Sequence, residues 1–390
     1  MSAKPPRIYT CTPFSFHGDR YFYTRDTGLL CRSLQALGAE SRAVMPLPAR
    51  EDDLPDAPLI RVPLRCLKSV AWWRAQELDG VMLYSWGDPR YTGVARAIHR
   101  AGIRLVIHYD ANCELHEHLK RPGGAVKRLV NRVKDTLINR MRAHHLAYAD
   151  TITTTPANRD AFLHDPAYGE RIAAKCVEMP CPVSPVFQHA GQGRERLFVA
   201  VGKWSDVVNK RPEMLTATLD AYYATTDAAE LCDMEVYGTP TPEMLAWHAA
   251  LPPHVQPHVR LLGNVDHATL CRAYNRARAS LCTSYAEGTH NASLEAHCCG
   301  AAVVCPNRPV HLCNVIWYTQ DGGGTVSAED TPQSLAAALQ AESAAWDAGR
   351  RDPAGIAAAW QPKVFPPLTL PGLFPGIGLR DGGDGCELQG

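Results

Sequence analysis

Short runs of apolar and β-branched residues alternate with longer stretches of helical periodicity along most of the chain. This alternation is typical of parallel sheets covered by helices. Such a pattern predicts an α/β protein with a helix over residues 27–37 that Gly38 ends. Strands are predicted at residues 7–12, 41–45, 80–85, 104–109, 150–155 and 175–179, and again at 196–201, 233–237, 259–262, 279–283 and 301–305.

The two series of strands are separated by a segment rich in proline and polar residues. Pro180, Pro182 and Pro185 fall within six residues, and a polar stretch that contains glycine follows them. This composition is typical of a linker. We therefore predict two domains, over residues 1–186 and 187–360. They are followed by a Pro/Gly-rich tail, residues 361–390, which we expect to pack partly as extended chain and to fray at its end.

Composition narrows the classes of protein that fit. The chain has 390 residues, of which 46% are apolar, and its 40 Lys and Arg balance 40 Asp and Glu, which argues against a general nucleic-acid binder. We find neither a membrane-length apolar run nor the apolar segment of a signal peptide, and we expect a cytoplasmic location. The 14 cysteines form no C-x-x-C pair or zinc-finger spacing, so we expect reduced thiols and no metal.

The most informative segment covers residues 283–300. A strand ends near Thr283, a loop carries Glu287, and a helix begins around Asn291 and ends at Gly300. Free N–H groups and the positive dipole end make such a helix N-terminus suitable for phosphate. Glu287 and Glu295 are separated by seven residues, so both carboxylates can point into one cleft.

This segment resembles the E-x7-E motif of retaining glycosyltransferases with the GT-B fold. The resemblance implies two Rossmann-like, doubly wound domains facing each other across a cleft. It implies that Glu295 binds the ribose of a nucleotide sugar and that Glu287 contacts the transferred sugar. The residues that help to hold the donor through the backbone after Glu287 are then Gly288, Thr289, His290, Asn291 and Ala292. A solvated helix face is the alternative interpretation.

A second match covers residues 199–212, which resemble the family's Gly-Arg strand end and the Lys-Gly pair that follows it. The resemblance implies that Gly202, Lys203 and Lys210 lie at the donor's diphosphate. Lys203 stands where Arg is usual, and Arg211 stands where Gly is usual. A Lys keeps the charge but loses the bidentate fork of Arg. Which of the three basic residues reaches the phosphates stays open, and a surface basic cluster is the alternative.

A third match covers residues 259–274, which resemble the strand, loop and helix whose backbone reads the nucleotide base in this family. The resemblance implies that Asn264 and Val265 lie beside the base. Together the three matches follow one another in the family's order.

The N-terminal half is less diagnostic. Gly18 lies where the family has a glycine-containing loop under the sugar and the diphosphate. The aromatic residues 21–23 could form a platform for the acceptor, but a core cluster is the favoured interpretation. After the strand at 104–109 the family places a His or an Asp near the reacting sugar, so Asp110 is the leading candidate and His108 the second. For His108 alone, a buried core histidine is favoured.

Residues 120–142 contain eight basic residues against the single acid Asp135, and their apolar residues recur at helical spacing. The favoured interpretation is that this apolar stripe packs into the core. The alternative is that the basic helix 124–142 makes weak peripheral contact with an anionic membrane. The glycines at 322–324 lack the following Lys-Ser/Thr of a phosphate loop, so we predict a turn.

The resemblance implies a hexosyltransferase that acts with retention on a nucleoside diphosphate sugar, with a UDP-sugar favoured and a GDP-sugar possible. The acceptor and the oligomeric state are not indicated, and no cofactor or metal is expected. The catalytic candidates are Glu287, Asp110, Lys203 and Lys210. The alternatives are a non-catalytic nucleotide-sugar-binding protein and a sugar-nucleotide epimerase of the same fold.

Overall fold

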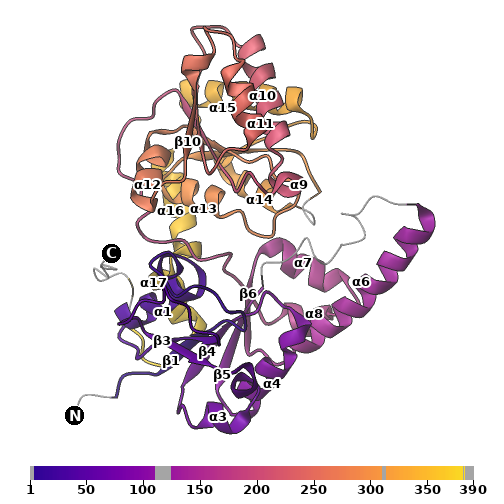
Figure 1. Cartoon of the computed structure of the whole chain (residues 1–390), viewed down its shortest axis with the longest axis vertical. Coiled ribbons are helices and arrows are strands. Elements are labelled where there is room, and N and C mark those ends of the chain that lie inside the picture. Colours follow the sequence, from indigo (N-terminus) through magenta and orange to yellow (C-terminus); the bar gives the residue numbers. More distant parts are fainter. Residues whose placement is uncertain (1–3, 110–123, 310–312, 381, 383–390) are drawn as a thin grey trace. The chain divides into compact units, whose positions relative to one another are not determined.

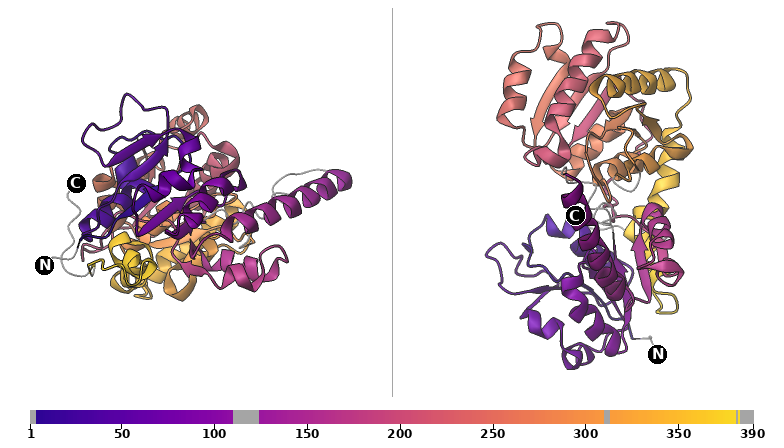
Figure 2. Two further views of the ribbon diagram at one scale, coloured as in Figure 1. Left: turned by 90° about the horizontal axis from the view of Figure 1, so that it is seen from below. Right: turned by 90° about the vertical axis from the view of Figure 1, so that its right-hand side faces the viewer.

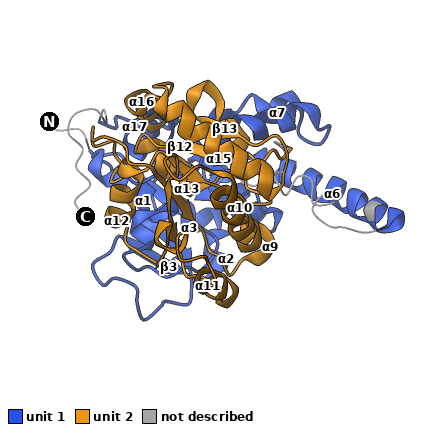
Figure 3. Cartoon of the chain, turned by 90° about the horizontal axis from the view of Figure 1, so that it is seen from above, with its two compact units in different colours: residues 1–184, 362–390 blue, residues 185–361 orange. Residues whose placement is uncertain are grey.

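The computed structural model describes residues 4–109, 124–309, 313–380 and 382, and it contains two parallel sheets (Figure 1). The chain packs as two compact units, which Figure 3 shows in different colours. The first unit comprises residues 1–184 and 362–390, and the second comprises residues 185–361. In the described ranges we find no helix that is both long enough and apolar enough to cross a bilayer.

The first unit is built on a seven-stranded parallel sheet in the order β3-β2-β1-β4-β5-β6-β7. The strand order reverses between β1 and β4, and such a reversal leaves a crevice at the carboxyl ends of the strands where ligands of α/β proteins bind. The strands are β1 (Ile8–Cys11), β2 (Ala43–Pro46), β3 (Leu59–Val62), β4 (Gly80–Tyr84), β5 (Arg104–His108), β6 (Thr151–Thr154) and β7 (Cys176–Glu178).

Successive side chains of each strand point to opposite faces of this sheet, and both faces are buried in the core. Tyr9 and Leu83 belong to one core cluster, and Ile8 and Met82 belong to another. The helices of this unit are η1 (Phe22–Thr24), α1 (Asp26–Ala36), α2 (Leu64–Leu67), α3 (Val70–Arg74), η2 (Pro89–Tyr91), α4 (Thr92–Arg100), α6 (Ala125–Leu146), α7 (Pro156–His164), α8 (Gly169–Ala173) and α17 (Pro366–Leu373).

The second unit has a six-stranded parallel sheet in the order β10-β9-β8-β11-β12-β13, whose order reverses between β8 and β11. The strands are β8 (Leu197–Val201), β9 (Asp233–Tyr237), β10 (Val259–Gly263), β11 (Ala279–Leu281), β12 (Ala302–Cys305) and β13 (Gly324–Val326). The helices are α9 (Val207–Lys210), α10 (Pro212–Thr225), α11 (Pro242–Ala249), η4 (Gln256–His258), α12 (His267–Arg276), α13 (Asn291–Cys298), α14 (Val315–Tyr318), η5 (Gln320–Gly322) and α15 (Pro332–Asp347); α16 (Pro353–Val364) runs on into the first unit.

Each predicted strand has a counterpart among the described strands, whereas β3 and β13 were not predicted. Both are edge strands whose residues are all only partly buried, so neither carries a continuous apolar signal. The prediction of a turn at residues 322–324 is wrong at Gly324, which begins β13. Glycine is needed there because a Cβ would collide with the backbone carbonyl of Val303.

Two further predictions about local structure are wrong. The tail contains the helix α17, which places Leu370 and Leu373 in the core of the first unit, instead of extended chain alone. Pro366 and Pro367 occupy the first positions of this helix, where proline is tolerated because the N–H groups have no helical partner. The apolar stripe of α6 is exposed instead of packed into the core: Val126, Leu129, Val130, Val133, Leu137 and Met141.

The cysteines of the described ranges are all free thiols, and most are buried. They pack as small apolar side chains, as expected for reduced cysteines.

Candidate functional site

The loops that follow β8 and β11 lie on either side of the strand-order reversal in the second unit. They are joined by an ion pair in which the Lys210 Nζ donates a hydrogen bond to Glu287 Oε1 at 2.5 Å. The two residues are 77 positions apart in the sequence. The fold therefore brings together two predicted site residues at the edge where α/β proteins bind ligands.

Asn209 ties the same two loops together through three further hydrogen bonds. Its backbone carbonyl accepts from the Tyr285 amide at 2.7 Å, and its Oδ1 accepts from the Ala286 amide at 3.0 Å. Its Nδ2 donates to Glu287 Oε1 at 3.4 Å. Asn209 was not predicted as a site residue, although its place beside Lys210 is a signal that could have found it.

The electrostatics of the pair favour a charged lysine. The side chains of Lys210 and Glu287 are only 19% and 11% exposed. Burial opposes the charge on Lys210, but the charge of Glu287 and the hydrogen bond to it outweigh burial, so the pKa of Lys210 is raised. The site therefore keeps an ammonium and a carboxylate next to each other, ready to bind ligand groups of opposite sign.

The N-terminus of α13 follows this loop and can bind an anion. His290 is its N-cap and makes no side-chain cap hydrogen bond, because its ring instead lies 2.8 Å from the Ser293 hydroxyl. In the part of the chain that the structure describes, two buried oxygens next to this terminus, Thr289 Oγ1 and Asn291 Oδ1, have no hydrogen-bond partner. Free backbone N–H groups and the helix dipole favour negative charge here. Gly288 is held nearby, since its carbonyl accepts from Asn314 Nδ2 at 2.8 Å.

Arg211 fixes the shape of the loop after β8. Its backbone has φ of 51°, in the left-handed region that glycine adopts most readily. Its guanidinium donates to the Thr283 carbonyl at 2.6 Å and to both carboxylate oxygens of Asp330 at 2.8 and 3.0 Å. Because these contacts already occupy Arg211, the structure favours a structural role for it over phosphate binding.

Lys203 differs from Lys210 in its surroundings. It is exposed directly after β8, and within the described ranges its ammonium makes no ion pair. Gly202, the residue before it, packs against the Trp204 ring, to which an added Cβ would come within 3.0 Å. Trp204 is buried and donates to the Tyr237 carbonyl at 2.9 Å, which anchors the start of this loop.

Asn264 and Val265 follow β10, so they lie at the same edge of the sheet. Both are exposed, and Asn264 Nδ2 donates to Thr239 Oγ1 at 2.9 Å. Glu295 lies within α13 and is half-buried. Ala292, in the first turn of the same helix, is buried. Burial, with the charge of Glu295 added, raises the pKa of Tyr274 well above its ordinary value.

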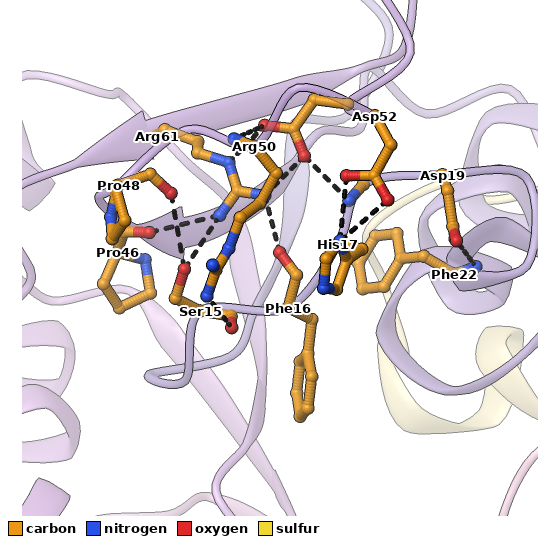
Figure 4. Close-up of polar contacts among 12 residues, drawn as sticks. Ser15, Phe16, His17, Asp19, Phe22, Pro46, Pro48, Arg50, Asp52 and Arg61 are labelled. Carbon is orange, nitrogen blue, oxygen red and sulfur yellow. Dashed lines mark hydrogen bonds and ion pairs between the residues drawn. The ribbon is translucent and has the colours of Figure 1, made fainter.

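In the first unit, Gly18 belongs to a loop that is held by an arginine and an aspartate. The Gly18 amide donates to Asp53 Oδ1 at 2.8 Å, and the Arg61 guanidinium forms an ion pair with the Asp53 carboxylate. Arg61 also donates to the Phe16 carbonyl at 2.6 Å, as Figure 4 shows. A Cβ on Gly18 would lie 2.6 Å from Leu59 Cδ2 and 2.8 Å from Asp53 Oδ1, so a larger residue here would have to displace these side chains.

An aromatic cluster that the sequence did not predict lies at the strand-order reversal of the first unit. Phe14 and Phe16 follow β1, Trp86 follows β4, and Tyr91 ends η2. The Phe14 ring lies 5.0 Å from Trp86 and 4.8 Å from Tyr91 between centroids. By contrast, Phe22 and Tyr23 of the predicted platform are buried in the core, as the favoured interpretation held, and Tyr21 is exposed. Only the fold places residues 14, 16, 86 and 91 together.

His108 is a buried core histidine at the end of β5, as favoured. Its Nδ1 lies 3.0 Å from Thr153 Oγ1, and its ring stacks on Tyr84 at 4.2 Å. Burial lowers the pKa of His108 to about 3, so the ring is neutral at physiological pH. Asp110, the leading candidate of this half, lies outside the described residues.

No cluster of three or more His, Cys, Asp or Glu side chains in the described ranges could hold a metal ion. That the protein needs no metal stays a prediction.

Comparisons with known proteins concern the sequence of the second unit and the fold of the chain. Residues 195–341 match the model of the family described as Glycosyl transferases group 1. No curated protein sequence matches the chain. Among solved structures, the chain is similar to a sucrose-phosphate synthase from Thermosynechococcus elongatus, with a TM-score of 0.61 and 15% identity over 92% of this chain and 95% of that one.

Two further structures share the fold. A glycosyltransferase from Rickettsia africae gives a TM-score of 0.63 and 10% identity over 95% of this chain and 98% of that one. HepE of Anabaena, solved in complex with UDP, gives a TM-score of 0.56 and 14% identity over 90% of this chain and 98% of that one. At these identities the likeness establishes the fold alone. The chain has the GT-B fold, with its two parallel sheets.

Proposed function

We propose that the protein is a retaining glycosyltransferase that moves a hexosyl group from a nucleoside diphosphate sugar to an acceptor hydroxyl. The observation that carries the proposal is the Lys210–Glu287 pair, which joins the loops after β8 and β11 beside the N-terminus of α13. The match of residues 195–341 to the group 1 glycosyl transferases supports it, because all of these features lie within that range.

In the proposed reaction the bond between the anomeric carbon and the diphosphate oxygen breaks. A new bond forms from the acceptor oxygen to the same face of that carbon, and the departing diphosphate takes up the proton of the acceptor hydroxyl. The diphosphate gains charge as it leaves, so cations and N–H groups fixed around it lower the barrier. Lys210, Lys203 and the N-terminus of α13 have the right charge and lie at the same sheet edge. These groups would make a metal unnecessary.

The remaining roles follow from position. Glu287 would orient the transferred sugar through its second carboxylate oxygen, since Oε1 already accepts from Lys210 and Asn209. Glu295 would bind the ribose, and Asn264 with Val265 would lie beside the base. We favour a UDP-sugar, with a GDP-sugar as the next choice; HepE was solved with UDP.

The acceptor would bind to the first unit, at the carboxyl ends of β1 and β4. Sugar rings and other apolar faces stack on aromatic side chains, and the cluster of Phe14, Phe16 and Trp86 offers such faces. Asp110 stays the proposed catalytic residue of this unit.

The experiment is a thermal-shift screen of UDP-, GDP- and ADP-sugars, followed by mass spectrometry of the products formed with candidate acceptors. Glu295→Ala should weaken nucleotide binding by roughly 1.5–3 kcal/mol, the value of a hydrogen bond to a charged group. Glu213→Ala, which removes an exposed carboxylate of the same unit, is the control. Equal nucleotide affinity for the two variants in calorimetry would overturn the assignment of Glu295.

Products formed without an acceptor separate the alternatives. A new sugar nucleotide would indicate an epimerase. Donor binding with neither transfer nor hydrolysis would indicate a binding protein.

A further inference from the structure

The helix α6 carries an apolar face that no other part of the described chain covers. Val126, Val130, Val133 and Leu137 recur at intervals of three and four residues and therefore share one side of the helix. They are 77%, 47%, 55% and 55% exposed, and Leu129 and Met141, at 62% and 54%, extend the same side. In Figures 1 and 2 the first turns of α6 extend away from the sheet of the first unit.

From Asp135 onward, the side of α6 opposite the stripe faces the protein and buries several polar residues. Asp135, Asn139 and Arg142 are buried. Asn139 Nδ2 donates to Asp165 at 3.3 Å, and its Oδ1 accepts from the Tyr168 hydroxyl at 3.3 Å. These contacts fix the rotation of the helix about its axis. Turning the apolar stripe inward would break them and bury unpaired polar groups, which is costly.

The exposed surface of α6 is also strongly basic. Lys127, Arg132, Lys134 and Arg140 are all exposed, and the one acid of the helix, Asp135, is buried. The chain as a whole has no net charge, so this positive surface is local. An apolar stripe flanked by cations fits a surface that combines hydrocarbon with negative charge.

We propose that α6 docks the protein on the surface of a bilayer that contains anionic lipids. The stripe enters the boundary between headgroups and acyl chains, and the four exposed cations bind the lipid phosphates. Its 22 residues would lie along the surface over about 33 Å, at about 1.5 Å per residue. The helix does not span the membrane, because it is not apolar enough for that.

The test is flotation of the full chain with vesicles, without any donor or acceptor. Vesicles of phosphatidylcholine alone are compared with vesicles that carry phosphatidylglycerol in addition. We expect the protein to float with the anionic vesicles only, and to bind less at high salt, because screening weakens attraction between exposed charges and phosphates. Since no sugar nucleotide is present, the result does not depend on the proposed function.

Two variants separate the stripe from the charges. The stripe variant is Val130→Gln, Val133→Gln and Leu137→Gln, and the charge variant is Lys127→Gln, Arg132→Gln, Lys134→Gln and Arg140→Gln. Each should weaken vesicle binding by at least about tenfold, because the apolar and electrostatic contributions add. Glutamine keeps helix propensity high, and all substituted side chains point to solvent, so circular dichroism should be unchanged.

Matched controls remove similar groups elsewhere. One control replaces exposed leucines of three other helices, Leu163→Gln, Leu245→Gln and Leu368→Gln. The other replaces four exposed cations of the first unit, Arg65→Gln, Lys68→Gln, Arg96→Gln and Arg100→Gln. Both should bind anionic vesicles as the unaltered protein does.

Three results would overturn the proposal. The unaltered protein could fail to float with anionic vesicles, or the control variants could lose binding as much as the α6 variants do. The third is a dimer in sedimentation that the stripe variant abolishes and that anionic vesicles do not disrupt, which would assign the stripe to a second copy of the chain.

Discussion

Glu287 accepts a hydrogen bond from the Lys210 ammonium at 2.5 Å, and this contact closes the two loops that flank the strand-order reversal of the second unit. The pair has two separable consequences. It stabilises the loops by neutralising a nearly buried carboxylate, and it presents a cation where the proposed diphosphate leaves. Substitutions can distinguish the two.

Lys210→Met should destabilise the protein and lower turnover. Glu287 would be left without its charged partner, at a cost of roughly 1–3 kcal/mol in the free energy of unfolding. Turnover should fall more than donor affinity, because charge on the diphosphate grows toward the transition state. The double variant Lys210→Met, Glu287→Gln should regain stability but not turnover. Denaturant unfolding and steady-state kinetics measure both, and full turnover in either variant contradicts the assignment.

Lys203 and Arg211 should behave oppositely. Lys203→Met should leave the free energy of unfolding unchanged, since the Lys203 ammonium is exposed and makes no ion pair within the described chain. It should weaken binding of a nucleoside diphosphate, because the proposed role of Lys203 is to contact the phosphates. Arg211→Ala should lower the free energy of unfolding by roughly 1.5–3 kcal/mol, because it removes the charged hydrogen bonds to Asp330. Arg211→Gly should be less harmful, because glycine adopts the positive φ without strain.

A nucleoside without phosphates is the control ligand for this comparison. It should bind the unaltered protein and Lys203→Met equally. Undiminished affinity of Lys203→Met for the diphosphate, measured by calorimetry, would show that Lys203 does not reach the phosphates.

The loop that holds Gly18 should weaken in acid. Arg61 is the main cause that lowers the pKa of Asp53 to about 2, against about 3.9 in an unfolded chain. A carboxylate whose pKa is lower in the folded protein stabilises the fold fully at pH values above the pKa of the unfolded chain. This stabilisation is lost as pH falls from about 4 through about 2. The unaltered protein should therefore be more stable than Asp53→Asn at pH 5–7 by a constant difference, which narrows below about pH 4.

Unfolding curves in denaturant across this pH range provide the measurement. Asp52→Asn, which changes the neighbouring and more exposed carboxylate that pairs with His17, is the control and should show a smaller difference. A gap for Asp53→Asn that stays constant down to pH 3 would be inconsistent with the Arg61 contact.

Phe374→Ala should destabilise the first unit by roughly 3–5 kcal/mol, the usual cost of emptying an aromatic core position. Phe374 is 1% exposed, and its ring packs so closely on Gly80 that a Cβ there would lie 2.6 Å away. Leu368→Ala, at an exposed position of α17, should cost far less. Comparable losses for both substitutions, measured by thermal unfolding, would place Phe374 outside the core.

Local sequence signals were enough to predict most of the strands along the chain, because buried parallel strands such as β4 and β12 are continuous apolar runs. The GT-B fold was predicted from the resemblance to a family, and the order of the strands within each sheet was not predicted. The motif around Glu287 was visible for a similar reason, since its residues are neighbours in sequence. The sequence could not show that Glu287 pairs with Lys210, because that contact depends on which strands become neighbours in the sheet.

The orientation of α6 was mispredicted for a physical reason of the same kind. Helical spacing shows that apolar residues share a face, but not which face meets the protein. That choice is made by Asn139 through its contacts with Asp165 and Tyr168, which lie beyond the helix in sequence. The aromatic cluster of Phe14 and Trp86 was missed because its members come from loops that follow different strands.

The helix α17 gives the two halves of the chain an order of assembly. Residues 362–379 leave the ribosome after the whole second unit, yet Leu370, Leu373 and Phe374 fill the core beneath β1 and β4. We therefore expect part of the apolar sheet face of the first unit to stay uncovered during synthesis until these residues emerge, when all residues of the second unit have already been made. A nascent chain stalled before residue 362 would present that face to chaperones or proteases, although most of the first unit's residues were translated long before.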